Sequence, residues 1–258
     1  MIPASIFPVT WSREKRTAVT IALAMFAMVV FLFSLASILS LMPDPIGPAA
    51  AQFAAGALVT VRLTVFAGLA GIVLGIVASM SELSSFLPLR WLAKFYIWVF
   101  RGTPLLVQVM FAYSLTWNDK SILTEMDAAL LALALNVGAY NAVAISGGIL
   151  AIHKGQTEAA RSLGLSRLQT FRDVIFPQAM RIALPPLVNN IVSLLKDTSL
   201  AYVIGVVELA NIANQIKSSS FQPTPVFITI GVIYLVLTTI MTQISSAIER
   251  QLDVERHK

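Results

Sequence analysis

Long apolar runs separated by short polar segments dominate the sequence. A helix needs about 20 mostly apolar residues to cross the roughly 30 Å hydrocarbon core of a bilayer. Six runs reach that length, and they are Thr17–Leu41, Phe53–Met80, Trp91–Trp117, Asp127–Ile152, Leu187–Val207 and Val226–Ile248. The pattern predicts an all-α polytopic membrane protein with six transmembrane helices. The first run exceeds the roughly 7–15 apolar residues of a signal peptide, so we interpret it as a span.

The composition supports a membrane location. Hydrophobic residues make up 57% of the 258 residues and charged residues only 12%, whereas about 25% of a soluble domain is charged. The sequence has no cysteine and only two histidines, His153 and His257, which stand far apart. We therefore expect no disulfide, no metal site and no catalytic residues.

Basic residues predict the orientation, because Lys and Arg concentrate in cytoplasmic loops. With the N-terminus inside, thirteen of the eighteen Lys and Arg residues fall in cytoplasmic segments, and only Lys120 and Lys217 fall in external loops. Both termini are therefore predicted to be cytoplasmic. The net charge of +5 is then a topology signal, and we expect no binding of nucleic acid.

The longest polar stretch, residues 153–186, lies between the fourth and fifth predicted spans on the cytoplasmic side. Thr157 is placed to cap a short helix, and Gly164 suits the left-handed turn that ends one. Ser166 is placed to cap a second, amphipathic helix, which Pro177 ends or kinks. We predict two short helices with a sharp bend; a solvated basic loop is the alternative that composition alone favours.

This loop and three further motifs resemble one group of proteins. The loop carries Glu158-Ala159-Ala160, followed by Gly164 and Pro177, which resembles the EAA loop of bacterial ATP-binding cassette (ABC) importer permeases. FRGTPLLVQ at 100–108, NVGAY at 136–140 and KDTSL at 196–200 are similar to motifs of the polar amino acid permeases, of histidine, glutamine, arginine or glutamate type. The resemblance covers about residues 56–248.

The resemblance implies a type I ABC importer fold in two parts. Residues 1–50 are expected to form a cytoplasmic N-terminus and an additional first span. Residues 51–258 are expected to form the permease domain, with residues 153–186 as the coupling loop. The residues implied to dock on an ATPase are Glu158, Ala159, Ala160, Leu163 and Gly164.

The implied function is transport of a polar amino acid across the bacterial cytoplasmic membrane by alternating access. The implied partners are two cytoplasmic ATPases, a second permease subunit (identical or paralogous), an external substrate-binding protein and membrane lipid. The chain lacks the Gly-x-x-x-x-Gly-Lys-Ser/Thr phosphate loop. We therefore expect no cofactor and no catalysis in this chain, and ATP with Mg²⁺ on the partner ATPase.

Polar residues inside the predicted spans are candidates for lining the substrate pathway. They are Arg101, Thr103, Asn136, Tyr140, Asn141, Lys196, Asp197 and Thr198. A charge at bilayer depth costs about 2.5–3.5 kcal/mol, so Lys196 and Asp197 require partners, for which Glu208 and Arg101 are candidates. Packing between helices is an equally good explanation for these residues.

Gly102 and Pro104 predict an interruption of the third span, of the kind that often marks where a substrate is held. Arg101 beside it either pairs with a substrate carboxylate or extends to the inner surface. A spacing of four residues between Gly71 and Gly75 predicts close approach of another helix to the second span.

Two positions depart from the family pattern. Many relatives place Glu and Arg where this chain has Val143 and Ser146, which leaves open whether this subunit has its own substrate site. Two other functions remain as alternatives. A secondary transporter would need intramembrane acids, of which only Asp197 qualifies, and a non-transporting scaffold would not need the interrupted span together with the EAA loop. The sequence does not identify the amino acid carried.

Overall fold

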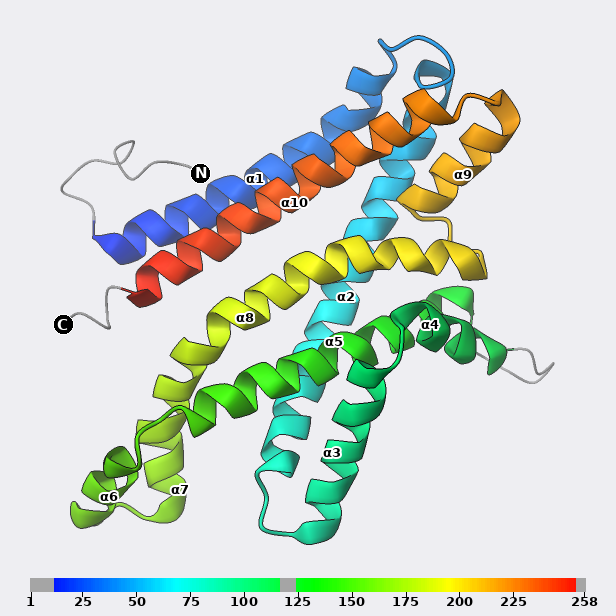
Figure 1. The fold of residues 1–258 in the computed structure, drawn as a ribbon. Helices are drawn as coiled ribbons and strands as arrows, with labels where there is room; N and C mark the ends of the chain where they lie inside the picture. Colours follow the sequence, from blue (N-terminus) through cyan, green and yellow to red (C-terminus); the bar gives the residue numbers. More distant parts are fainter. Residues whose placement is uncertain (1–11, 117–123, 254–258) are drawn as a thin grey trace.

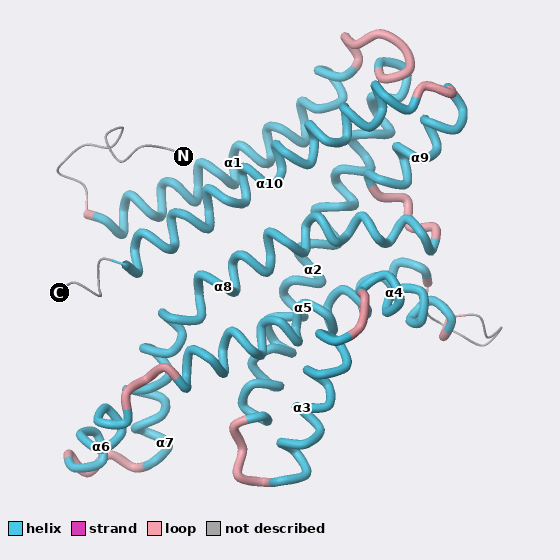
Figure 2. The backbone as a smooth tube through the Cα atoms, in the orientation of Figure 1, coloured by secondary structure: helices cyan, strands magenta, loops and turns pink. Residues whose placement is uncertain are grey.

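The computed structural model describes residues 12–116 and 124–253, which form helices joined by turns (Figures 1 and 2). The α-helices are α1 (Arg13–Leu39), α2 (Ala50–Glu82), α3 (Leu87–Gly102), α4 (Leu105–Ser114), α5 (Glu125–Leu150), α6 (Lys154–Ser162), α7 (Arg167–Gln169), α8 (Phe176–Asp197), α9 (Leu209–Ser220) and α10 (Pro223–Asp253). The 3₁₀ segments are η2 (Gly47–Ala49) and η4 (Thr198–Ile204), and η3 (Thr170–Ile175) is π-helical. Trp117, Lys120, Arg256, His257 and Lys258, used in the sequence predictions, lie outside the described residues.

The described helices agree with the predicted number of spans. Four are long and apolar enough to cross a membrane: Lys15–Leu39, Gly47–Glu82, Glu125–Leu150 and Pro223–Glu249. Two bent pairs qualify when each is counted as one span. α3 and α4 meet at 109°, and the helical segment Arg167–Ile204 meets α9 at 51°. Six spans result, as predicted.

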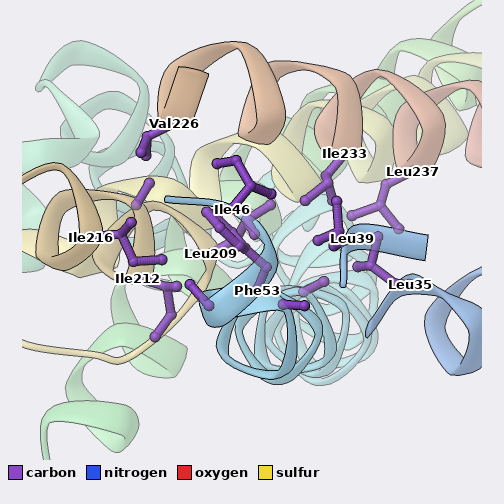
Figure 3. Packing of buried hydrophobic residues seen from close by; sticks show 14 of the residues in the cluster. Leu35, Leu39, Ile46, Phe53, Leu209, Ile212, Ile216, Val226, Ile233 and Leu237 are labelled. Carbon is purple, nitrogen blue, oxygen red and sulfur yellow. The ribbon is translucent and has the colours of Figure 1, made fainter. Parts of the chain in front are cut away.

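An apolar cluster holds α1, α2, α9 and α10 together (Figure 3). α1 and α10 lie side by side and run in opposite directions (Figure 1). The largest side chains of the cluster include Leu35, Leu39, Phe53, Leu209, Ile233 and Leu237. Because lipid tails are as apolar as these side chains, close packing is what favours this association in a membrane.

α2 and α5 cross closely through glycine. A Cβ atom added to Gly71 would overlap the Val137 side chain, and one added to Gly75 would lie 2.6 Å from the Cβ of Asn141. Neither position has room for a side chain. The close approach predicted from these two glycines is confirmed.

Proline does not end the helix that follows the loop. The chain stays helical from α7 through η3 and α8, with Pro177 in the first turn of α8 and Pro185 and Pro186 inside it. A helix end predicted at Pro177 is therefore wrong: a π-helical turn precedes this proline, and its missing N–H falls in the first turn of α8. The predicted fifth span, Leu187–Val207, was also misplaced, since α8 begins at Phe176 and ends at Asp197.

Candidate functional site

Two features of the fold stand out: a projecting loop and a polar cavity. The loop consists of α6, α7 and η3, which lie together at one end of the molecule (Figure 1). α6 begins at Lys154, and the His153 Nδ1 atom caps it by accepting a hydrogen bond from the Gly155 N–H at 3.1 Å. The predicted cap at Thr157 is therefore wrong.

A left-handed glycine turn reverses the chain after α6. Gly164 has φ of +83°, and apart from the glycine and its two chain neighbours no atom of the described chain lies within 4 Å of the place where its Cβ would be. The Leu165 N–H donates to the Ala160 carbonyl at 3.3 Å, and the Arg161 guanidinium donates to the Leu165 carbonyl at 2.8 Å. The helix-ending turn predicted at Gly164 is confirmed, and these bonds make it a fixed bend.

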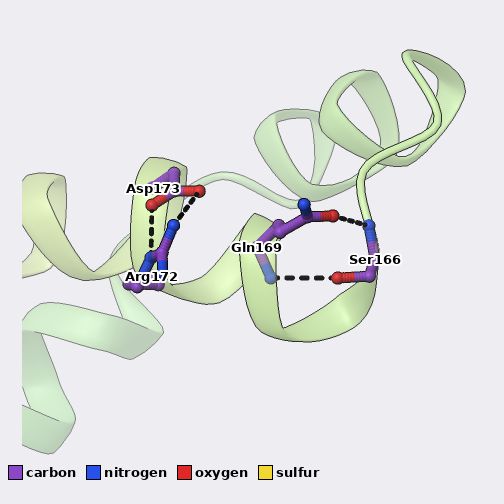
Figure 4. A network of polar contacts seen from close by, with 4 residues as sticks. All are labelled: Ser166, Gln169, Arg172 and Asp173. Carbon is purple, nitrogen blue, oxygen red and sulfur yellow. Dashed lines mark hydrogen bonds and ion pairs between the residues drawn. The ribbon is translucent and has the colours of Figure 1, made fainter.

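A capping box starts the returning helix (Figure 4). The Ser166 hydroxyl accepts from the Gln169 N–H at 3.3 Å, and the Gln169 side chain accepts from the Ser166 N–H at 2.9 Å. This confirms the cap predicted at Ser166. One turn later, Arg172 binds Asp173 at 2.7 Å, and this hydrogen bond lowers the pKa of the Asp173 carboxyl. Both side chains are exposed, so the pair adds little stability.

The tip of the loop exposes apolar surface. The Leu163 side chain is 83% exposed and Leu168 is 73% exposed. Glu158 and Ala159 are also exposed, whereas Ala160 is buried within the loop. Among the residues implied to dock on an ATPase, Ala160 therefore shapes the tip from inside, and the others face outward.

The polar cavity has a volume of about 420 Å³ and lies between α5, α8 and the break in the third span. Its lining residues are Thr103, Pro104, Leu105, Asn136, Val137, Tyr140, Asn190, Ser193 and Asp197. Four predicted pathway residues, Thr103, Asn136, Tyr140 and Asp197, thus meet in one place. Asn190 and Ser193 were not among the predicted pathway residues, although their spacing with Asp197 places all three on one face of a helix.

Amide side chains satisfy the backbone at the break. Pro104 has no N–H to donate to the Phe100 carbonyl one turn earlier. The Gln108 amide donates to that carbonyl at 2.9 Å and to the Thr103 carbonyl at 3.1 Å. Asn136 also donates to the Phe100 carbonyl, at 3.1 Å, and to the Gln108 side chain at 3.0 Å. The predicted interruption is confirmed, and its lost hydrogen bonds are replaced from α4 and α5.

Arg101 packs on the ring of Tyr140, a residue that lines the cavity. Its guanidinium carbon is 5.2 Å from the centroid of the Tyr140 ring, within cation–π range. Tyr140 itself lines the cavity and is partly exposed. This contact with α5 holds Arg101 at the rim of the cavity, and the Arg101 side chain remains exposed.

Lys196 and Asp197 point in different directions. Asp197 lines the cavity, whereas Lys196 is exposed and does not. Within the described residues neither forms an ion pair. The suggested pairing with Glu208 is wrong, since that carboxylate is fully buried and binds the Thr60 and Tyr234 hydroxyls instead.

Asn141 and Thr198 lie behind the cavity. Asn141 is fully buried, and its side-chain amide oxygen accepts from the Asn190 side-chain amide at 2.9 Å, which ties α5 to α8. The Thr198 hydroxyl donates to the Leu195 carbonyl at 2.8 Å. Ser146 is buried and bonds within its own helix. Among the described residues, no three His, Asp or Glu side chains are grouped as metal ligands would be.

Residues 71–254 match the family described as the binding-protein-dependent transport system inner membrane component. The chain belongs to this family. α1 precedes the part of the chain that matches the family.

Named relatives of this inner membrane component are similar over most of its length. The arginine transport system permease protein ArtQ of Bacillus subtilis is 38% identical over 198 residues, covering 76% of this chain and 90% of the relative. The glutamine transport system permease protein GlnP of Escherichia coli K12 is 37% identical over 212 residues, covering 81% and 96%. The octopine transport system permease protein OccM of Rhizobium meliloti is 39% identical over 216 residues, covering 79% and 87%.

Solved structures share the fold of this inner membrane component. A crystal structure of an amino acid ABC transporter with histidines has a TM-score of 0.74 at 36% identity, covering 79% of this chain and 95% of that one. The inward-facing MetNI methionine ABC transporter has a TM-score of 0.68 at 19% identity, covering 82% and 99%, and shows the fold alone. The predicted type I importer fold is confirmed.

Proposed function

We propose that this chain is the permease subunit of an ATP-driven importer that moves a polar amino acid across the bacterial cytoplasmic membrane. Family membership and the names of its relatives support this proposal. Neither an ion-gradient-driven transporter nor a scaffold is favoured by a described feature. The proposed partners are two ATPases that hold ATP and Mg²⁺, a second permease subunit and an external binding protein. We also propose that both termini are cytoplasmic, because that orientation puts most of the Lys and Arg residues in cytoplasmic segments.

The connectivity of the loop carries the proposal. The loop directly joins α5, which brings Asn136 and Tyr140 to the cavity, to α8, which brings Asn190 and Asp197. Because η3 continues into α8 without a break, a force on the tip is transmitted along a stiff helix to the cavity wall. An ATPase that moves the tip would therefore reshape the cavity, which alternating access requires.

The tip has the chemistry of a docking surface. Leu163 and Leu168 present exposed apolar side chains at a fixed bend, and an apolar anchor that enters a pocket is a common core of protein interfaces. Glu158 and Ala159 flank them on α6, while Gly164 leaves space for close approach. We assign Glu158, Ala159, Leu163 and Gly164 to the contact with the ATPase and Ala160 to the shape of the tip.

The cavity has the chemistry to hold an amino acid. Asp197 has no ion pair within the described residues, so its carboxylate can form one with the ammonium group of the substrate. Arg101 at the rim can bind the carboxylate, because a guanidinium fork matches a planar carboxylate. Thr103, Asn190 and Ser193 add hydrogen-bonding groups. Asn136, Asn141 and Thr198 support the cavity wall, and Lys196 lies outside it.

Copurification tests the docking assignment. Gly164→Asp places a carboxylate in the open space at the tip, and Glu158→Lys reverses a charge beside it. Burying an unpaired charge costs several kcal/mol, so each change should reduce recovery of the soluble ATPase with the tagged permease by about ten-fold or more. Ser85→Asp, in the exposed turn between α2 and α3, is the control and should retain the ATPase. Full recovery and full transport in both loop variants would show that the tip is not the docking site.

A further inference from the structure

Glu208 places a carboxylate in the interior, where α2, α9 and α10 meet. The residue is 0% exposed and lies at the 51° bend between the long helical segment and α9. Apolar side chains of the large cluster, including Phe53, Leu209 and Ile233, belong to the same three helices. A buried carboxylate is costly unless it is fully hydrogen-bonded, so its partners indicate what it is for.

Four groups donate to this carboxylate. The N–H groups of Ala210 and Asn211 each donate at 2.9 Å, the Tyr234 hydroxyl at 3.1 Å and the Thr60 hydroxyl at 3.4 Å. An ionised carboxylate only accepts hydrogen bonds, so this set of donors suits it. The start of α9 also favours negative charge. Glu208 therefore connects a residue of α2 and a residue of α10 to the first turn of α9.

The network reaches the wall of the cavity. The Glu208 N–H donates to the Val206 carbonyl at 2.9 Å, and the Val206 N–H donates to the Ala201 carbonyl of η4 at 3.3 Å. Thr198 opens η4 and directly follows Asp197, which lines the cavity. A chain of backbone hydrogen bonds thus runs from Glu208 through Val206 to η4, the segment that directly follows Asp197.

We propose that Glu208 is a positioning residue, which holds η4 against α2 and α10 so that Asp197 stays in the pathway cavity. This role rests on the proposed transport function. The apolar cluster already holds α2, α9 and α10 together. Removing one hydroxyl from the network should therefore loosen η4 without unfolding these helices.

The ratio of ATP hydrolysed to amino acid transported tests this role. Permease, ATPase and binding protein are reconstituted in proteoliposomes, and both rates are measured. Thr60→Val and Tyr234→Phe each remove one donor to Glu208, and we expect the ratio to rise by roughly two- to ten-fold, the effect of one hydrogen bond. Thr60→Ser keeps a hydroxyl and should restore the normal ratio. Thr64→Val is the matched control, because the buried Thr64 hydroxyl donates to the Thr60 carbonyl of its own helix, at 2.8 Å, and to no other group in the described part of the chain.

Loss of stability alone would lower both rates together and leave the ratio unchanged, and that result would overturn the role of Glu208. Uptake by the unmodified complex is measured first, so failure there counts against the proposed transport function instead. A second measurement does not depend on transport. In the otherwise cysteine-free chain, Ser193→Cys reports on the cavity, and its reaction with a hydrophilic thiol reagent should change several-fold in Tyr234→Phe but not in Thr64→Val. An unchanged rate would contradict the proposal.

Discussion

At the scale of residues, Pro104 determines much of the local structure around the cavity. Its ring cannot donate a hydrogen bond, so the third span turns and its free carbonyls need donors. Gln108 supplies two of them, and Asn136 bonds both the Phe100 carbonyl and Gln108. Asn136 therefore has a structural role in addition to lining the cavity.

Gln108→Leu tests this arrangement. The change keeps the size of the side chain but removes the donor to the Phe100 and Thr103 carbonyls and one of the two acceptors of the Asn136 amide. An unsatisfied buried group costs about 1–3 kcal/mol, so the thermal unfolding midpoint of the purified protein in detergent should fall. Gln215→Leu, on the exposed side of α9, should leave it unchanged. An equal midpoint in both variants would contradict the role of Gln108.

The sequence predicted only some of the cavity residues. The motif around Pro104 located the break, and Tyr140 and Asp197 were identified as polar residues within apolar spans. Whether a polar side chain faces a cavity or a neighbouring helix depends on helix rotation, which hydropathy does not determine. Asn141 and Thr198 were therefore grouped with the lining residues although both are buried behind them, and Asn190 was missed.

At the scale of elements, glycine determines how closely α2 and α5 pack. Gly71 and Gly75 face Val137 and Asn141 with no space for a methyl group. This close crossing fixes α5, and α5 carries one wall of the cavity. The same contact is also where the packing of the two helices is most sensitive to added volume.

Gly71→Ala should destabilise the protein. The new methyl group overlaps Val137, and overpacking typically costs about 1–3 kcal/mol. Gly147→Ala, also on α5, meets no neighbour within 4 Å and should be neutral or slightly stabilising, since Ala favours helix. Thermal unfolding of the two variants, compared under the same detergent conditions, checks this. If Gly71→Ala unfolds no earlier than Gly147→Ala, the described crossing of α2 and α5 is wrong.

Element types were easier to predict than their boundaries. Apolar runs of spanning length identified six spans because the bilayer imposes that length. The run Trp91–Trp117 gave no measure of the 109° angle between α3 and α4. Pro177 was interpreted as the end or a kink of a helix, because the sequence does not reveal the π-helical turn η3 that precedes it.

At the scale of the whole molecule, the same two helices carry the loop at one end and line the cavity further along. α5 and α8 connect them, and the Asn141–Asn190 hydrogen bond holds these two helices together between the ends. α1 packs mainly along α10 and α2. A motor protein bound at the tip would therefore move the cavity wall directly.

The most direct test is the accessibility of the loop tip from each side of the membrane. Because the chain has no cysteine, Leu163→Cys gives a single thiol at the most exposed apolar position of the tip. A membrane-impermeant maleimide should label it in inside-out vesicles only, and bound ATPase should slow the labelling by about ten-fold or more, as expected for a buried interface residue. Labelling from the external face, or labelling that the ATPase does not affect, would contradict the proposed coupling.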